Sequence, residues 1–197
     1  MNTPSSDEQD IQVMARLASG HDAALNDLME RHGASLFHYL LRVLQNEADA
    51  ADLAQETFVR VYRNRAVFDR RQRFATWLYA IAANLVRDRF RWRSRHPQIS
   101  LDAEQEPTEA PLKDSLWAAD ASPDQHLQTA ERADAVRQAV AALPEELRQP
   151  LILAVYQELP QAEIAAILHC SVKAVETRIY RARHLLRARL GALRPDL

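Results

Sequence analysis

The segment of residues 159–186 most constrains the fold, because two helical patterns follow one another there across a very short polar break. Apolar residues recur at three- and four-residue intervals on both sides of Cys170 and Ser171, and only the second pattern carries arginines. This arrangement predicts a helix-turn-helix, in which one helix braces a second that lies in the major groove of DNA. A nucleic acid is therefore the expected partner.

The second pattern, expected to begin at residue 172, separates an apolar arc from a polar face. The arc is expected to be buried and comprises Val172, Val175, Ile179, Ala182 and Leu186. Ser171 precedes it and can cap the helix by accepting a backbone N–H bond. The candidate DNA contacts are Lys173, Ala174, Glu176, Thr177, Arg178, Tyr180 and Arg181. Lys173, Ala174 and Thr177, near the helix start, suit contacts with base edges, and Arg178 and Arg181 suit contacts with phosphates. The alternative is an arginine-rich surface helix.

Composition favours helices throughout. Glycine occurs only three times, alanine and leucine are abundant, and no stretch alternates apolar and polar residues with period two. The predicted fold class is all-α, with two small helical domains at 8–95 and 130–193 joined by an acidic, proline-containing linker at 96–129. Gly33 predicts a break within the first domain, and Pro150 predicts either a late helix start or a bend in the second.

The single cysteine, Cys170, excludes an internal disulfide and a cysteine-cluster zinc site. Its neighbour His169 has no helical histidine partner, so we predict no metal and no cofactor. No run of about 18 apolar residues occurs, and the N-terminus is polar and acidic, which argues against a membrane span and a secretory signal. A cytoplasmic location is expected.

Charge is segregated along a chain whose formal net charge is only −2. Residues 1–57 carry 3 basic and 10 acidic side chains, whereas residues 58–95 carry 11 and 2. Residues 96–130 are acidic again, with 1 and 7, and residues 171–194 carry 7 and 1. Two separate cationic surfaces favour two contacts with a polyanion over ordinary solvated helix faces, which usually mix both signs.

In the first predicted domain, a helix expected from residue 74 carries a polar strip opposite its apolar stripe. The strip consists of Thr76, Ala80, Asn84, Arg87 and Arg91. An amide that can bond an unpaired base edge and arginines that can follow phosphates suit single-stranded DNA, and Arg73 in the preceding loop adds positive charge. The alternative is a solvated face. Trp77, at the margin, is expected to pack in the core rather than to stack on a base.

Three motifs, in this order, resemble the sigma-70 family of bacterial RNA polymerase sigma factors. DAADLAQETF at 49–58 is similar to the core-polymerase-binding helix, and FATWLYAIAANLVRDR at 74–89 resembles the segment that opens and reads the −10 promoter element. LPEELR at 143–148, AEIAAIL at 162–168 and RIYRAR at 178–183 resemble the −35-reading helix-turn-helix. Two such modules joined by a short linker are the layout of the extracytoplasmic-function (group 4) subfamily.

The resemblance implies a sigma factor that binds core RNA polymerase, directs it to promoters and helps to open the −10 region, and that is not an enzyme. The residues it implies for polymerase binding are Asp49, Asp52, Gln55 and Glu56. Those implied for the −10 element are Thr76, Asn84, Arg87 and Arg91, and the candidate contacts of the last helix would read the −35 element. An anti-sigma factor is an implied partner.

Four residues depart from the family's pattern. They are Ala51 in the polymerase motif, Pro160 at the start of the brace helix, His169 at the turn and Glu176 in the reading helix. His169 stands where glycine is usual, and histidine can adopt a positive φ, although less readily than glycine; Glu176 can select a base such as cytosine. A stand-alone helix-turn-helix regulator is the main alternative, but it leaves the strip at 76–91 unused. The sequence contains no constellation of catalytic residues, which argues against an enzyme. A protein that only binds other proteins would have no need of two cationic faces.

Overall fold

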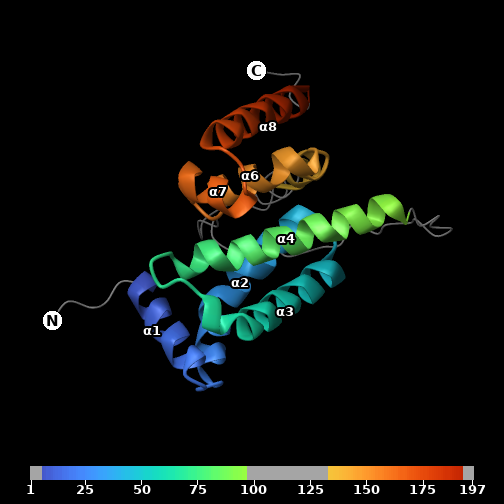
Figure 1. Cartoon of the computed structure of the whole chain (residues 1–197). Coiled ribbons are helices and arrows are strands. Elements are labelled where there is room, and N and C mark those ends of the chain that lie inside the picture. Colours follow the sequence, from blue (N-terminus) through green and yellow to red (C-terminus); the bar gives the residue numbers. More distant parts are fainter. Residues whose placement is uncertain (1–5, 97–132, 193–197) are drawn as a thin grey trace, which may run out of the picture.

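The structure, a computed structural model, describes residues 6–96 and 133–192 (Figure 1). The α-helices include α1 (Ser6–Ala18), α2 (Ala24–Leu44), α3 (Glu47–Arg63), α4 (Phe74–Arg95), α6 (Glu145–Val155), α7 (Gln161–Leu168) and α8 (Val172–Ala192). A 3₁₀ turn, η1, covers Arg65–Val67, and a further helical stretch covers 133–141. No residue within the two described ranges lies in a strand, so the all-α prediction is confirmed. The predicted linker lies, except for His96, outside the described residues.

The N-terminal unit is a bundle in which α2 packs against α3 and α4, while α1 packs against α2 (Figure 1). The apolar stripes of these helices turn inward and bury Leu28, Leu36, Leu40, Leu53, Phe58, Phe74 and Leu78. Between α2 and α3, Gln45 ends one helix in the left-handed conformation, at φ 55°. Asn46 then caps the next, because its side chain accepts the N–H of Asp49 at 2.8 Å.

The break predicted at Gly33 is wrong, because α2 runs without interruption from Ala24 to Leu44. A glycine within a helix costs about 1 kcal/mol relative to alanine, which is small beside the burial of the large residues around it. Leu28, Leu36 and Leu40 are all fully buried on the same helix. Tertiary packing therefore outweighs the local preference of a single residue.

The C-terminal unit contains the predicted helix-turn-helix, formed by α7 and α8. His169 ends α7 with φ 51° and ψ 49°, in the left-handed conformation that histidine adopts less readily than glycine. Ser171 then accepts the N–H of Ala174 at 3.1 Å, as expected of the N-cap of α8. No side chain caps the start of α7 at Pro160. The turn therefore stays short although it lacks the usual glycine.

Two details of this unit refine the sequence analysis. Val175, Ile179 and Ala182 are buried, but Val172 is 46% exposed, so its predicted burial is wrong. Val172 is the first residue of α8, whereas Val175, in the same turn, is fully buried. Pro150 lies inside α6, which begins at Glu145 and continues to Val155, so the helix does not start late.

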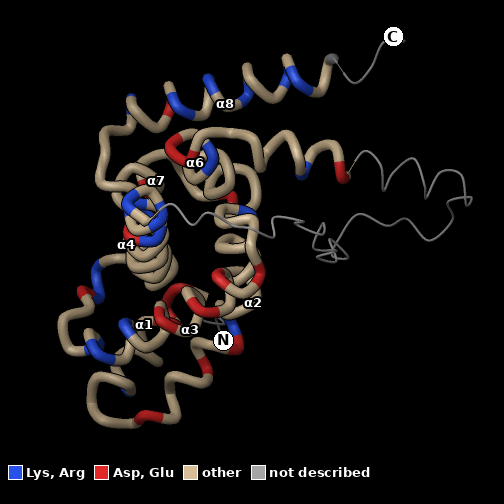
Figure 2. Tube along the Cα trace, turned by 90° about the vertical axis from the view of Figure 1, so that its right-hand side faces the viewer, with Lys and Arg blue, Asp and Glu red and all other residues tan. Residues whose placement is uncertain are grey.

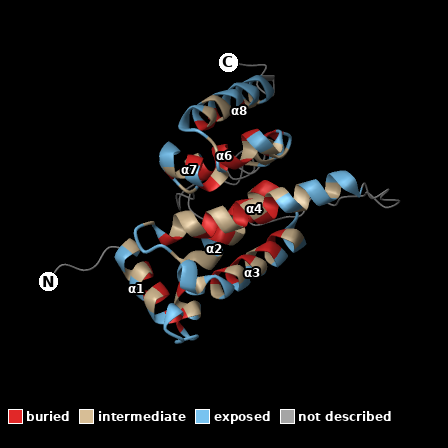
Figure 3. Ribbon diagram, viewed as in Figure 1, coloured by how far each residue is buried: buried red, intermediate tan, exposed pale blue. Residues whose placement is uncertain are grey.

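The two units pack against each other through α7 on α4 and α6 on α2, and their buried side chains form a single core (Figure 3). Polar contacts join them as well. The hydroxyl of Tyr39 donates to Gln149 at 3.2 Å, and that of Tyr79 donates to Gln157 at 2.5 Å. Arg148 donates to the backbone carbonyl of Val43 at 2.6 Å. The helix α4, which carries the polar strip, thus packs against α2 and α3 of its own bundle and against α7 of the C-terminal unit.

Candidate partner and nucleic-acid interfaces

The helix α3 presents an acidic face to solvent (Figure 2). Asp52 and Gln55, nearly one turn apart, are both exposed. Glu56 is partly exposed and accepts a hydrogen bond from Arg60 on the same helix at 2.9 Å. One turn beyond Gln55, Val59 is 39% exposed and adds an apolar side chain. An acidic face with an apolar edge is chemically complementary to a basic protein surface.

Asp49, predicted for the same face, lies elsewhere. Its side chain is only 13% exposed, and it forms ion pairs with Arg89 at 3.2 Å and with Arg93, both from α4. It therefore ties the start of α3 to the end of α4. The partners of Asp49 lie 40 and 44 residues further along the chain, and local charge patterns reveal only contacts within one helix, so the sequence hid this pairing.

The exposed side of α8 carries positive charge along its length (Figure 2). Lys173, Glu176, Tyr180 and Arg181 are exposed, whereas Ala174, Thr177 and Arg178 are partly buried. An open groove runs between α6 and the first turns of α8, and it is lined by Glu146, Leu147, Ser171, Lys173, Ala174, Thr177, Arg178 and Arg181. Most of the candidate DNA contacts of this helix thus lie together around one groove.

Among the candidate DNA contacts of α8, the ammonium group of Lys173 donates a hydrogen bond to the carboxylate of Glu176 at 2.7 Å. This hydrogen bond raises the pKa of Lys173 above its usual value, and the negative charge of Glu176 adds to the effect. The carboxylate that could read a base is thus held beside a lysine on the exposed first turns of α8. The two side chains form one donor–acceptor pair at the position where a reading helix meets base edges.

The polar strip of α4 is less open than its sequence suggests. Thr76, Asn84 and Arg87 are partly buried, and only Arg91 is exposed. Asn84 accepts a hydrogen bond from Arg87 at 3.0 Å, and Arg91 pairs with Asp88. Because the sequence of the strip is almost free of acids, we expected unbalanced positive charge. The structure instead pairs Arg91 with Asp88 of the same helix, and it pairs Arg89 and Arg93, beside the strip, with Asp49 of α3.

The charge of Arg87 also acts on the C-terminal unit. Burial raises the pKa of Glu145, at the start of α6, while its hydrogen bond with Gln149 and the positive charge of Arg87 act in the opposite direction. The positive charge of Arg87 therefore acts on a carboxylate at the start of α6.

Trp77 packs as expected of a core residue. Its ring lies 5.1 Å from that of Phe68 and 6.3 Å from that of Phe74, between ring centroids. Tyr79 is buried, and its hydroxyl donates a hydrogen bond to Gln157 of the C-terminal unit. Both aromatic residues therefore have structural partners in this arrangement.

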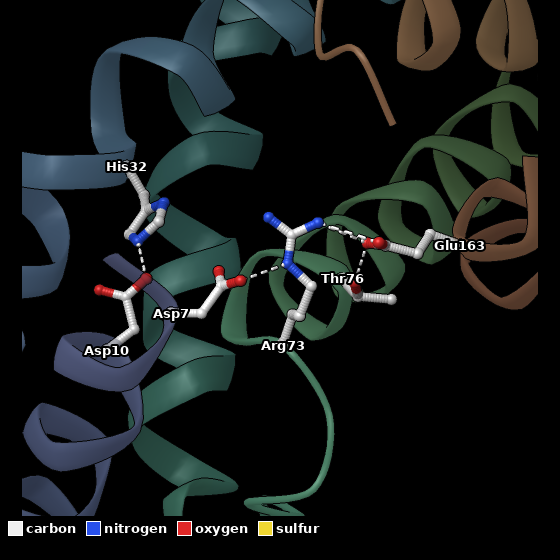
Figure 4. Close-up of polar contacts among 6 residues, drawn as sticks. All are labelled: Asp7, Asp10, His32, Arg73, Thr76 and Glu163. Atoms are coloured by element: carbon white, nitrogen blue, oxygen red, sulfur yellow. Dashed lines mark hydrogen bonds and ion pairs between the residues drawn. The ribbon is translucent and has the colours of Figure 1, made fainter. Parts of the chain in front are cut away.

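Arg73 joins three elements at the start of α4 (Figure 4). Its Nε donates to Asp7 of α1 at 2.8 Å, and its Nη1 donates to both carboxylate oxygens of Glu163 of α7, at 2.9 and 3.1 Å. The hydroxyl of Thr76 donates to the same carboxylate at 2.7 Å. The hydrogen bond with Glu163, followed by that with Asp7, raises the pKa of Arg73 above its usual value.

Sequence analysis missed Glu163, Gln149 and Gln157 as residues that join the two units. Each is a polar side chain in a short helix or turn, and no periodic pattern marks its partner. One signal was available: Tyr39 and Tyr79 lie on apolar stripes, and a buried phenol requires a hydrogen-bond partner. That requirement predicts a polar partner for each without identifying it.

Two further findings concern sites of other kinds. Among residues 6–96 and 133–192, no three His, Cys, Asp or Glu side chains are grouped as a metal ion would need. In the same ranges, no helix combines the length and the apolar character that crossing a membrane requires. His169 and Cys170 form the turn between α7 and α8, and Cys170 packs against the core.

Family models match both units of the chain. The model for sigma-70 region 2 matches residues 28–96, and the model for sigma-70 region 4 matches residues 133–186. The chain is 35% identical over 179 residues to the ECF RNA polymerase sigma factor SigW of Bacillus subtilis, covering 90% of this chain and 95% of that protein. It is 34% identical over 188 residues to the RNA polymerase sigma factor CnrH of Cupriavidus metallidurans, covering 94% and 96%.

Solved structures agree with this similarity. The structure of CnrH in complex with the cytosolic domain of CnrY has a TM-score of 0.65 with this chain at 30% identity, and covers 93% of this chain and 97% of that one. The sigma factor RpoE of Bartonella quintana, solved in complex with the anti-sigma factor NepR, also has a TM-score of 0.65, at 20% identity, with coverage of 86% and 98%. The second likeness concerns the fold alone.

Proposed function

The chain belongs to the extracytoplasmic-function sigma factors of the sigma-70 family, and we propose how its surfaces divide the work of such a factor. A sigma factor directs core RNA polymerase to promoters, and this family acts by binding rather than by catalysis. We assign polymerase binding to the exposed face of α3, −10 recognition to α4 and −35 recognition to α8. We expect no catalytic activity of the chain itself.

The observation that carries the first assignment is the exposed acidic face of α3. Asp52 and Gln55 are exposed there, and Glu56 is partly exposed beside them. Asp49, which pairs with two arginines of α4, contributes by holding the two helices together. A surface that docks the polymerase and a helix that meets DNA are thus fastened to one another.

The −35 assignment is supported by the groove between α6 and α8. Lys173 and Arg181 lie on its rim and are exposed, so they can meet phosphates or base edges without rearrangement of α8. Glu176 and Tyr180 complete the exposed set. A duplex that places its major groove over the first turns of α8 would contact all of them.

Energetics require a partner for promoter opening. Separating DNA costs about 1.4 kcal/mol per stacked step on average. Stacking one extruded base on an aromatic side chain recovers about 1–3 kcal/mol. Trp77 already packs against Phe68 and Phe74, so its ring is engaged within the fold. The polymerase must supply the remainder, so the chain alone should bind DNA weakly and in a salt-sensitive manner.

An anti-sigma factor is the remaining proposed partner. CnrH, the solved relative that is 30% identical to this chain, forms a complex with the cytosolic domain of CnrY. We propose that a regulator of this kind binds the present chain. A cytoplasmic location follows from the proposed role, because its polymerase and promoter partners are found there.

Run-off transcription on a library of genomic fragments tests the function. Core polymerase with the chain should give discrete transcripts, whereas core polymerase alone should not. A stand-alone regulator predicts a different result: tight binding to a duplex operator in a gel shift without polymerase, and no transcripts that depend on the chain. Absence of chain-dependent transcripts would refute the proposed function.

A further inference from the structure

An anion-binding arrangement stands at the start of α4, and a carboxylate from the other unit occupies it. Arg73 is the N-cap residue of the helix, and Thr76 lies in its first turn. Together they give three hydrogen bonds to Glu163, two from the guanidinium and one from the hydroxyl, at 2.7 to 3.1 Å. Figure 4 shows both side chains turned toward this carboxylate.

The surroundings favour an anion at this point. The first turn of α4 contains no acidic residue, and no side chain caps its N-terminus. The first N–H groups of a helix carry partial positive charge, which adds to that of Arg73. Glu163 comes from α7, about ninety residues along the chain, and its side chain is only 24% exposed. The anion is therefore provided by the packing of the two units and not by local sequence.

A DNA phosphate offers the same chemistry as this carboxylate. Both are anions with several acceptor oxygens, and both accept two hydrogen bonds from one guanidinium. Threonine hydroxyls also donate to backbone phosphates in protein–DNA complexes. While α7 lies on α4, however, Glu163 fills the site and its negative charge would repel a phosphate.

We propose that Arg73 and Thr76 form a binding site for a backbone phosphate of the −10 strand, and that Glu163 occupies this site as an internal competitor. This inference rests on the proposed role of α4. Packing of α7 on α4 and binding of a DNA strand at the start of α4 then exclude one another. Separation of the two units exposes the site, and DNA replaces the carboxylate.

Two of the polar contacts between the units are compatible with such an exchange. Gln157 and Gln149 each accept a hydrogen bond from a tyrosine of the N-terminal unit, and water can take the place of either amide. Asp7 stays with the N-terminal unit, where it continues to hold Nε of Arg73. The guanidinium therefore keeps its orientation while Nη1 becomes available to phosphate.

The test uses the full chain with Glu163→Gln, which removes the charge and preserves the size of the side chain. A matched control is Glu158→Gln, since Glu158 is exposed on the same unit five residues earlier and the change in net charge is identical. Binding of a short single-stranded DNA oligonucleotide is measured by fluorescence anisotropy. Small-angle X-ray scattering reports whether the two units separate, and thermal unfolding confirms that each variant is folded.

We expect Glu163→Gln to raise the affinity for the oligonucleotide by about five- to tenfold and to increase the radius of gyration. Glu158→Gln should change the affinity less than twofold, within the screening expected of one remote exposed charge. Adding Arg73→Ala to Glu163→Gln should abolish the gain. Equal affinities of Glu163→Gln and the unmodified chain, or an equal gain in Glu158→Gln, would overturn the inference.

The run-off assay on the same preparations separates the two levels of the argument. A chain that directs the polymerase to promoters, but in which Glu163→Gln brings no gain in strand binding, overturns the competition by Glu163 and leaves the proposed function intact. A chain that directs no transcription overturns the proposed function, and the inference falls with it.

Discussion

Asp49 and Asp52 lie three residues apart on one helix but have different surroundings. Asp52 is exposed, while Asp49 has 13% of its side chain exposed and pairs with Arg89 and Arg93. The sequence placed both in one motif, and nothing in the local pattern distinguishes them. The structure separates them because α4 passes over the start of α3. Their substitutions should therefore have different consequences.

Asp49→Asn should lower the free energy of unfolding by about 1–2 kcal/mol, because it leaves two arginines beside an amide in place of a charge. Urea denaturation of the full chain measures this change. Asp52→Asn is the matched control and should stay within about 0.5 kcal/mol of the unmodified chain, as is usual for exposed sites. Equal losses in both variants would show that the pairing of Asp49 contributes no stability.

Asp52→Arg should abolish binding to core RNA polymerase, because it places a positive charge on the face that we propose meets a basic receptor. Anisotropy of the labelled chain titrated with core polymerase measures this. Glu30→Arg makes the same change of charge on the exposed side of α2 and should leave the affinity intact. Residual DNA binding should survive in both, and its loss in Asp52→Arg would point to misfolding instead.

At the scale of the element, helix positions followed well from apolar spacing. Periodicity predicted α4 and α8 because their stripes step by three and four residues, and Ser171 marked the start of α8 by its capping hydroxyl. The errors arose where a local signal competes with packing. Gly33 did not end its helix, and Val172 is exposed although it belongs to the apolar arc of α8.

Gly33→Ala should stabilise the chain by about 0.5–1 kcal/mol. Gly33 lies inside α2, and an added Cβ meets no atom within 4 Å, so the methyl group brings helix propensity without a clash. Thermal unfolding monitored by circular dichroism should show a raised midpoint. A lowered midpoint would show that the helix uses the freedom of glycine at this position.

Arg178→Ala should weaken binding to a −35 duplex and reduce the slope of log affinity against log salt concentration by about one, as the loss of one phosphate contact does. Arg189→Ala removes an equal charge from the exposed last turns of α8 and serves as the control. Binding to core polymerase should be unchanged in both. An unaltered salt slope in Arg178→Ala would exclude Arg178 from the phosphate contacts.

At the scale of the whole molecule, the sequence predicted two helical units and their charges but not how the units meet. The contacts that join them link residues far apart in the chain, such as Tyr39 with Gln149 and Thr76 with Glu163. Single polar pairs of this kind follow no period, so patterns cannot reveal them. The candidate site on α4 was therefore identified by its residues, while its cover by α7 required the structure.

The central claim is that an acidic face recruits the polymerase and that two cationic helices then address the promoter together with it. Permanganate reactivity of −10 thymines measures promoter opening directly, on a promoter identified by run-off transcription. We predict reactive thymines only when core polymerase and the chain are both present. Reactive thymines with the chain alone, or none with the complete holoenzyme, would contradict the account.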